Sequence, residues 1–143
     1  MRKLLIAILV LGLAYVFLDQ SGQDALFQNR PTDVDSVIAD AFASRRSDFL
    51  VEGQGEVVRV LSDDIDGDRH QQFILRLGSG QTLLIAHNID LAPRLPRLKE
   101  GDWVEFYGEY EWNDQGGVIH WTHHDPQGTH EAGWLKYQGR IYQ

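Results

Sequence analysis

HQQFILRLGSGQTLLIAH, residues 70–87, decides the fold class of this chain. Apolar and polar side chains alternate along residues 70–77, which places Phe73, Leu75 and Leu77 on one face of an extended strand. The glycines at 78 and 80 are typical of a tight hairpin turn, and residues 82–87 return as a second apolar strand. The stretch therefore predicts an antiparallel hairpin with one buried face.

Strand-like segments continue on both sides of this hairpin. The predicted strands cover residues 51–61, 70–77, 82–87, 103–112 and 118–124, with a small closing hairpin at 134–142. In the first strand, Gly53 and Gly55 predict a bulge or a sharp bend. Three strands in a meander, a connection and a two-strand hairpin form the strand order of an OB-fold barrel. We therefore predict an all-β domain with a minor helix, in which residues 49–143 form an OB-fold-like five-stranded barrel.

The N-terminal part predicts targeting and attachment. Arg2 and Lys3 precede a continuous apolar run over residues 4–18, which is the shape of a signal-anchor or a signal peptide. Residues 1–18 are therefore predicted to hold the protein at the inner membrane with its body on the periplasmic face; the alternative is secretion to the periplasm after cleavage. Residues 19–31 are a predicted linker, and apolar spacing over 32–48 predicts a short amphipathic helix.

Composition excludes several classes of function. The chain has no cysteine, which excludes disulfides, thiolate metal sites and a thiol nucleophile. The net charge is −8, and an acidic body repels phosphate backbones, so nucleic acid is a less favoured partner than a small molecule, an oligosaccharide or a protein. No serine lies in a nucleophile-elbow motif.

Four of the six histidines lie between residues 120 and 130. Histidine is the usual ligand of transition metals, and a nearby carboxylate completes many such sites. The hypothesis is a zinc or manganese site formed by His120, His124, Asp125 and His130. The opposing interpretation is that these histidines are packing residues, because their spacing matches no named metal motif. On a strand over residues 118–124, His120 and His124 would share one face.

Other polar and aromatic residues are candidates around this cluster. His70 begins the second strand and His87 ends the third, so the two could meet across the sheet and serve as acid and base in catalysis. The candidate ligand-binding residues are Asn88, Asp90, Trp112, Trp121 and His123.

Two stretches resemble a known family. AHNIDLAP at residues 86–93 and HWTHHDP at 120–126, with His130 and the Gly133-Trp134 pair, are similar to a family of small exported bacterial proteins described as a domain of unknown function. The resemblance covers nearly everything after the linker and implies no activity.

Two hypotheses for function follow. The first is a membrane-anchored periplasmic binding module whose histidine-rich edge holds a ligand or a metal. The alternative is a metal-dependent hydrolase of phosphodiesters. The acidic body favours the first hypothesis.

Overall fold

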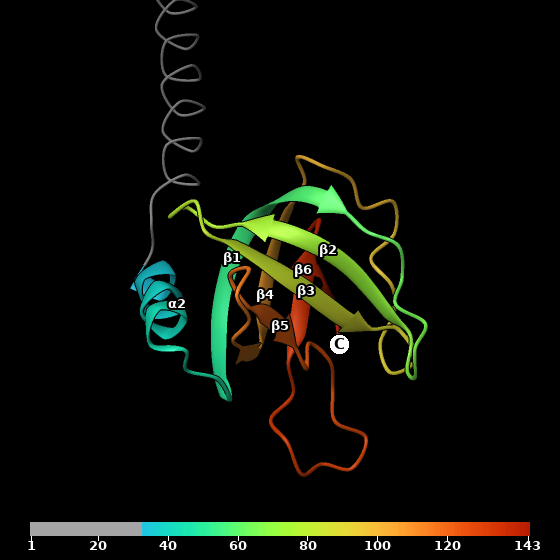
Figure 1. The fold of residues 1–143 in the computed structure, drawn as a ribbon. Coiled ribbons are helices and arrows are strands. Elements are labelled where there is room, and N and C mark those ends of the chain that lie inside the picture. The colour runs from blue at the N-terminus through green and yellow to red at the C-terminus, as the bar shows by residue number, and fades with distance from the viewer. Residues whose placement is uncertain (1–32) are drawn as a thin grey trace, which may run out of the picture. The chain divides into compact units, whose positions relative to one another are not determined.

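The computed structural model describes residues 33–143, which form a sheet-rich domain preceded by one short helix (Figure 1). Residues 1–32, which include the predicted anchor and linker, lie outside the described residues. The elements in chain order are α2 (Asp33–Ser44), β1 (Phe49–Val60), β2 (His70–Arg76), β3 (Thr82–Asn88), β4 (Trp103–Glu111), β5 (Val118–His120), β6 (Trp134–Tyr137) and β7 (Arg140–Tyr142). The predicted all-β class with a minor helix is confirmed.

The strands close into a barrel. Strand order runs β1-β2-β3-β5-β4, and β4 pairs with β1 to complete the circle. Every barrel pairing is antiparallel except that between β3 and β5, which is parallel. This is the closed five-stranded, OB-fold-like barrel that the strand order predicted. The hairpin of β6 and β7 extends the sheet beyond the barrel, because β6 pairs with the first half of β4 while β5 pairs with its end.

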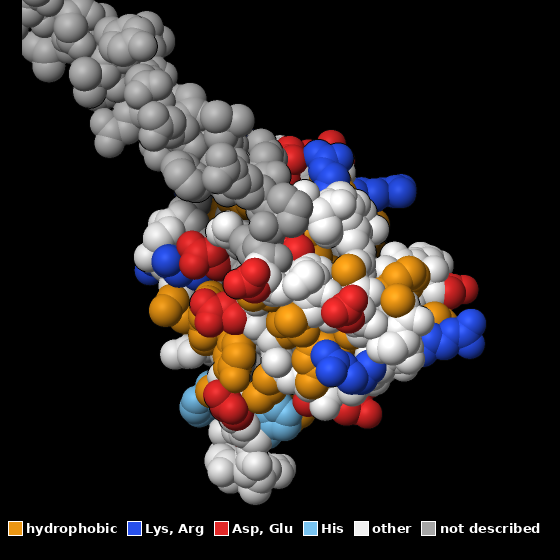
Figure 2. Space-filling model, turned by 90° about the vertical axis from the view of Figure 1, so that its left-hand side faces the viewer, with side chains coloured by type: hydrophobic (Ala, Val, Ile, Leu, Met, Phe, Trp, Pro, Cys, Tyr) orange, Lys and Arg blue, Asp and Glu red, His pale blue; other side chains and the backbone are white. Residues whose placement is uncertain are grey.

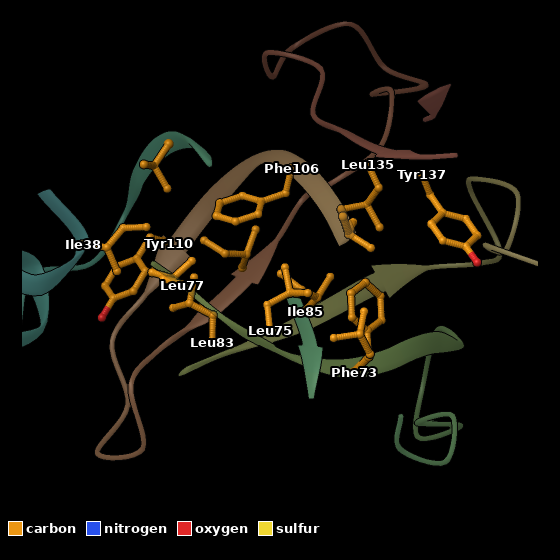
Figure 3. Close-up of a cluster of buried hydrophobic side chains, with 14 of the residues drawn as sticks. Ile38, Phe73, Leu75, Leu77, Leu83, Ile85, Phe106, Tyr110, Leu135 and Tyr137 are labelled. Carbon is orange, nitrogen blue, oxygen red and sulfur yellow. The ribbon is translucent and has the colours of Figure 1, made fainter. Parts of the chain in front are cut away.

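The period-two pattern of the sequence becomes the barrel core. Phe73 and Leu75 of β2, Ile85 of β3 and Phe106 of β4 are fully buried, and Figure 3 shows their side chains pointing into the same interior. Burying such a side chain stabilises a fold by about 1.5–3 kcal/mol relative to leaving it exposed. The core therefore fixes the register of the strands, since a shift by one residue would turn these groups outward.

The two glycines of β1 lie in a regularly paired stretch and not at a bulge. A Cβ atom built on Gly53 would lie 2.6 Å from the tip of the Phe106 ring, so glycine lets the ring of the facing strand approach the backbone. The irregularity in β1 lies further along, between Val57 and Arg59, where the pairing with β2 shifts register. The predicted bulge at Gly53 and Gly55 was therefore misplaced, since these residues pair regularly with β4.

Helix α2 packs on the barrel beside β1 (Figure 1). Ile38 and Ala41 are fully buried against the barrel core, as the helical spacing of apolar residues requires. Trp112, which follows β4, donates its indole N–H to the Phe42 carbonyl oxygen at 3.0 Å. Among the described residues, no helix is both long and apolar enough to cross a membrane.

The strand that carries the histidine cluster is shorter than predicted. β5 ends at His120, because Trp121 has a φ of +55° and leaves the extended conformation. Residues 121–133 instead form a long loop that projects from the lower end of the barrel in Figure 1; we call it the β5–β6 loop. The prediction that His120 and His124 share one strand face is wrong, since the strand ends at His120 and His124 lies in the loop.

Candidate functional site: a histidine-lined pocket beside the β5–β6 loop

A pocket of about 440 Å³ lies where three strand termini meet the β5–β6 loop. His70 begins β2, Asn88 ends β3 and His120 ends β5, and all three line the pocket. They converge because β2 runs antiparallel to β3, with His70 opposite Asn88, whereas β3 and β5 run parallel. The loop supplies the facing wall through residues that include Trp121 and His123. In Figure 2, histidine side chains gather at the lower end of the molecule, from which the loop projects.

Two pocket histidines are held in defined tautomers. His70 Nδ1 lies 2.8 Å from the Asp68 carbonyl oxygen, and His123 Nδ1 lies 2.8 Å from the His124 carbonyl oxygen. A carbonyl oxygen only accepts hydrogen bonds, so each Nδ1 must carry a proton and donate it. In the neutral imidazole the Nε2 atom of each ring then keeps a lone pair and can accept a hydrogen bond.

Two polar atoms beside the pocket are buried without a hydrogen-bond partner. They are the indole Nε1 of Trp121 and the Nε2 of His120, both on residues that line the pocket. His120 Nε2 lies near the carboxylates of Glu111 and Glu109, at 3.5 and 3.8 Å, without a hydrogen bond to either. Buried polar atoms without partners are uncommon in folded proteins and are often completed by water or a ligand. Trp121 also has a backbone conformation that costs energy for a residue with a Cβ atom. Both observations single out the end of β5.

Asp125 organises the loop. Its Oδ1 accepts the Gln127 backbone N–H, and its Oδ2 accepts the backbone N–H groups of Thr129 and His130 and the Thr129 hydroxyl. These donors stabilise the charged carboxylate and lower the pKa of Asp125 to about 2, with the Gln127 N–H contributing most. The carboxylate lines the pocket, but both of its oxygens are already bonded within the loop.

Asn88 and Asp90 hold the other wall. The Asn88 side chain donates to the Asp68 carboxylate at 3.1 Å and accepts the backbone N–H groups of Asp90 and Leu91. Asp90 forms an ion pair with Arg69 at 2.7 Å, and hydrogen bonds from Arg69 lower the pKa of Asp90. Asn88 therefore fixes the backbone turn at the pocket wall, while Asp90 holds this turn to Arg69 from outside the pocket lining.

His130 connects the β5–β6 loop to strand β4 and also contacts Trp121. Its Nε2 lies 2.9 Å from a carboxylate oxygen of Glu109, and its Nδ1 lies 2.7 Å from the Glu131 carbonyl oxygen. Both groups only accept hydrogen bonds, so the ring satisfies both contacts only when both nitrogens are protonated. The hydrogen bond to Glu109, followed by the one to Glu131, accordingly raises the pKa of His130. The His130 ring packs against Trp121, with centroids 4.1 Å apart and the ring planes tilted by 35°.

His87 faces the barrel interior and is fully buried. Its Nε2 donates to the Pro93 carbonyl oxygen at 3.0 Å, and its Nδ1 accepts the Thr122 hydroxyl at 2.8 Å. Burial lowers the pKa of His87 to about 4, which keeps the ring neutral. It pairs with Gln71, whereas His70 pairs with Asn88. The predicted meeting of His70 and His87 across the sheet is therefore wrong.

The structure brings together some of the predicted residues and separates others. Those that line the pocket are His70, Asn88, His120, Trp121, His123 and Asp125, and those outside its lining are His87, Asp90, Trp112, His124 and His130. Within residues 33–143, no group of three or more His, Asp or Glu side chains is arranged to hold a metal ion. The four side chains predicted as one metal site have separate surroundings, since Asp125 is bonded within the loop and His130 is bonded to Glu109.

Sequence reasoning missed Asp68, Leu91 and Glu109. The first two line the pocket, and Glu109 binds His130. The signal for Glu109 was present in the turn at residues 113–117, because a hairpin closed there sets Glu109 opposite His120. The contribution of Leu91 depends on the path of an irregular connection, for which the sequence has no periodic signal.

Comparisons with known proteins give one match. The family model described as "Protein of unknown function (DUF3465)" matches residues 24–143. The match confirms the resemblance to a family of unknown function that the sequence indicated. No curated protein matches the chain.

Proposed function

We propose that this chain, which belongs to the family described as protein of unknown function (DUF3465), is a binding module for a small uncharged polyhydroxy ligand such as a sugar. The observation that carries the proposal is the pocket together with the polar atoms of the residues that line it. His70 and His123 present Nε2 acceptors, and the Trp121 indole N–H is a buried donor without a partner. A hydroxyl group both donates and accepts hydrogen bonds, so it complements both kinds of atom.

The size and lining of the pocket support a small ligand. A volume of about 440 Å³ lies within the range of roughly 300–1,000 Å³ that is common for small-molecule sites. Leu91 and Pro126 add apolar surface, and both are exposed on the pocket wall. The C–H face of a sugar ring packs on such surface while its hydroxyls reach polar atoms. One or two sugar units are the size that we propose.

The charges around the pocket favour an uncharged ligand. Within the described residues, the pocket lining includes no lysine or arginine, while Asp68 and Asp125 contribute carboxylates. A phosphodiester would meet this acidic lining without a paired cation, in a chain whose net charge is −8. The lining therefore favours a binding module over a hydrolase of phosphodiesters.

We further propose that this module acts at the periplasmic face of the inner membrane. Arg2 and Lys3 followed by the apolar run at 4–18 support export with retention. A topology reporter fused after Gln143 should be active only outside the cytoplasm, and activity inside would contradict this placement.

The binding proposal is tested by labelling the full-length chain at histidine with ¹³C. With six histidines, each ring gives one resolvable Cε1–H signal that single substitutions assign. We expect methyl β-glucoside, methyl β-N-acetylglucosaminide or the corresponding disaccharides to shift the signals of His70, His120 and His123. The signals of His87 in the core and of exposed His124 should stay in place.

A matched pair of variants localises the binding. Leu91→Trp enlarges a half-exposed side chain on the pocket wall and should abolish the shifts. Ile65→Trp makes the same kind of change at a residue that is 77% exposed and outside the pocket lining, and should leave them unchanged. If added zinc shifts the histidine signals and none of the sugars does, the proposal is overturned in favour of a metal site. If no added compound shifts any signal, the proposal is also overturned.

A further inference from the structure

His130 connects a charged residue of the barrel to the pocket wall. Its two ring nitrogens contact Glu109 and the Glu131 carbonyl, and only the doubly protonated ring donates to both. The same ring packs against Trp121, which lines the pocket. The contacts that position His130 against Trp121, on one side of the pocket, are therefore complete only when the His130 ring is doubly protonated.

The loop has few side-chain ties to the barrel besides this one. Thr122 bonds His87 at the start of the loop, and the Tyr107 hydroxyl bonds the Glu131 carboxylate near its end. Between these ties, Asp125 holds the loop to itself rather than to a strand. Within residues 33–143, the His130 contact with Glu109 is thus the ion pair between the loop and the barrel strands.

We propose that the β5–β6 loop is a pH-gated wall of the pocket, which the His130–Glu109 ion pair holds in place and which loosens when His130 loses its proton. This inference rests on the proposed function, because it assigns regulation to the same pocket. Below the transition the ring donates to both acceptors and Trp121 is held. Above it the ring keeps one proton, one of the two contacts loses its hydrogen bond, and the His130 and Trp121 rings are free to move.

The direction of the pH effect follows from the charges that face His130. The titratable groups around it are Glu109 and Tyr107 of β4, His120 of β5, and Asp125 and Glu131 of the loop; Glu111 lies behind His120. The carboxylates favour the cation, while the other histidine adds no negative charge. The tie is therefore complete at low pH and is lost as pH rises through the raised pKa of His130.

The test follows His130 and Trp121 in the same full-length sample, without any ligand. A pH titration of the His130 Cε1–H signal should give a midpoint above the ordinary histidine value of about 6.5. The Trp121 indole N–H signal should move with the same midpoint. The Trp112 indole, which bonds the Phe42 carbonyl, should not follow it.

Two substitutions on β4 distinguish the effect of the His130–Glu109 ion pair from the effect of negative charge nearby. Glu109→Gln keeps the size of the side chain and removes the charge, so the midpoints of His130 and Trp121 should fall together. Glu111→Gln removes an equal charge that lies 3.5 Å from His120 Nε2, and should leave the His130 midpoint nearly unchanged. A melting curve shows that both variants remain folded.

The link to binding is measured with the methyl glycoside that binds tightest. Its affinity should fall by about tenfold as pH rises through the His130 midpoint, the difference between a charge-assisted and a neutral hydrogen bond. In Glu109→Gln the same fall should begin at lower pH. A Trp121 signal that ignores the titration of His130 would overturn the gate, whatever binds. Coupled His130 and Trp121 signals without any sugar binding would support the gate and refute the proposed ligand.

Discussion

Two histidines of this protein use both ring nitrogens and reach opposite protonation states. His87 lies in the barrel interior, where one partner is the Pro93 carbonyl and the other is a hydroxyl that can donate. His130 lies at the base of the β5–β6 loop, where both partners can only accept. The first ring has a pKa lowered to about 4 by burial, and the second has a raised pKa. The partners and the surroundings of a histidine therefore determine its charge more than its presence in a cluster does.

The largest difference between the barrel and the loop should be in the stability lost when a buried side chain is shortened. Phe106→Ala removes a fully buried ring that fills the space above Gly53, and we expect a loss of about 3–5 kcal/mol in the free energy of unfolding. Urea denaturation of the full-length chain measures it. A loss under about 1 kcal/mol would mean that the core is not centred where the barrel places it.

Acid should act on the barrel through His87. Its folded pKa of about 4 lies below the unfolded value of about 6.5, so the unfolded chain binds a proton first as pH falls. Stability should therefore decrease between pH 6.5 and 4, by about 3 kcal/mol from this group. The contribution of His130 has the opposite sign, because a raised pKa stabilises the fold at low pH and the effect is lost as pH rises.

The two contributions separate by substitution. Urea denaturation at several pH values should give a shallower acid loss for His87→Gln than for the unchanged chain, even though the variant starts less stable. An identical pH slope in both proteins would show that His87 is not the group that responds.

Thr122 joins the two regions, because it opens the loop and bonds the core histidine. Thr122→Val keeps the shape of the side chain but leaves His87 Nδ1 without its donor, which should cost about 1–3 kcal/mol. Urea denaturation gives the loss, and the His87 Cε1–H signal should move. An unchanged His87 signal would mean that the Thr122 hydroxyl does not bond the His87 ring.

The smallest effect is expected at His124. Its ring is exposed, and the loop uses its backbone carbonyl rather than its side chain. His124→Ala should change the free energy of unfolding by less than about 0.5 kcal/mol and leave sugar-induced shifts intact. Loss of those shifts in this variant would return His124 to the binding site.

The barrel was more predictable than the loop, for a physical reason. Alternation in residues 70–87 reports which side chains are buried, and the core followed it: Phe73, Leu75 and Ile85 are fully buried. The end of β5 has no such signal, because Trp121 takes a positive φ without being glycine. The predicted face shared by His120 and His124 depended on a strand that continued to residue 124, whereas β5 ends at His120; the metal site itself stays a prediction. The pocket residue His70 was predicted from its place at the start of a strand, whereas Asn88 was a candidate placed just beyond the predicted end of the third strand at residue 87.

The pairing of β4 has a consequence for how this protein can change. β5 and β6 occupy successive stretches of the same edge of β4, so the β5–β6 loop leaves and re-enters the sheet at neighbouring points. Gly133 closes the excursion: its N–H donates to the His123 carbonyl oxygen, and a Cβ atom there would lie 1.9 Å from the Trp121 carbonyl oxygen. Loops with adjacent ends tolerate changes of length at small entropic cost. The loop can therefore change in length without altering the pairing of the barrel strands, provided that the closing glycine is kept.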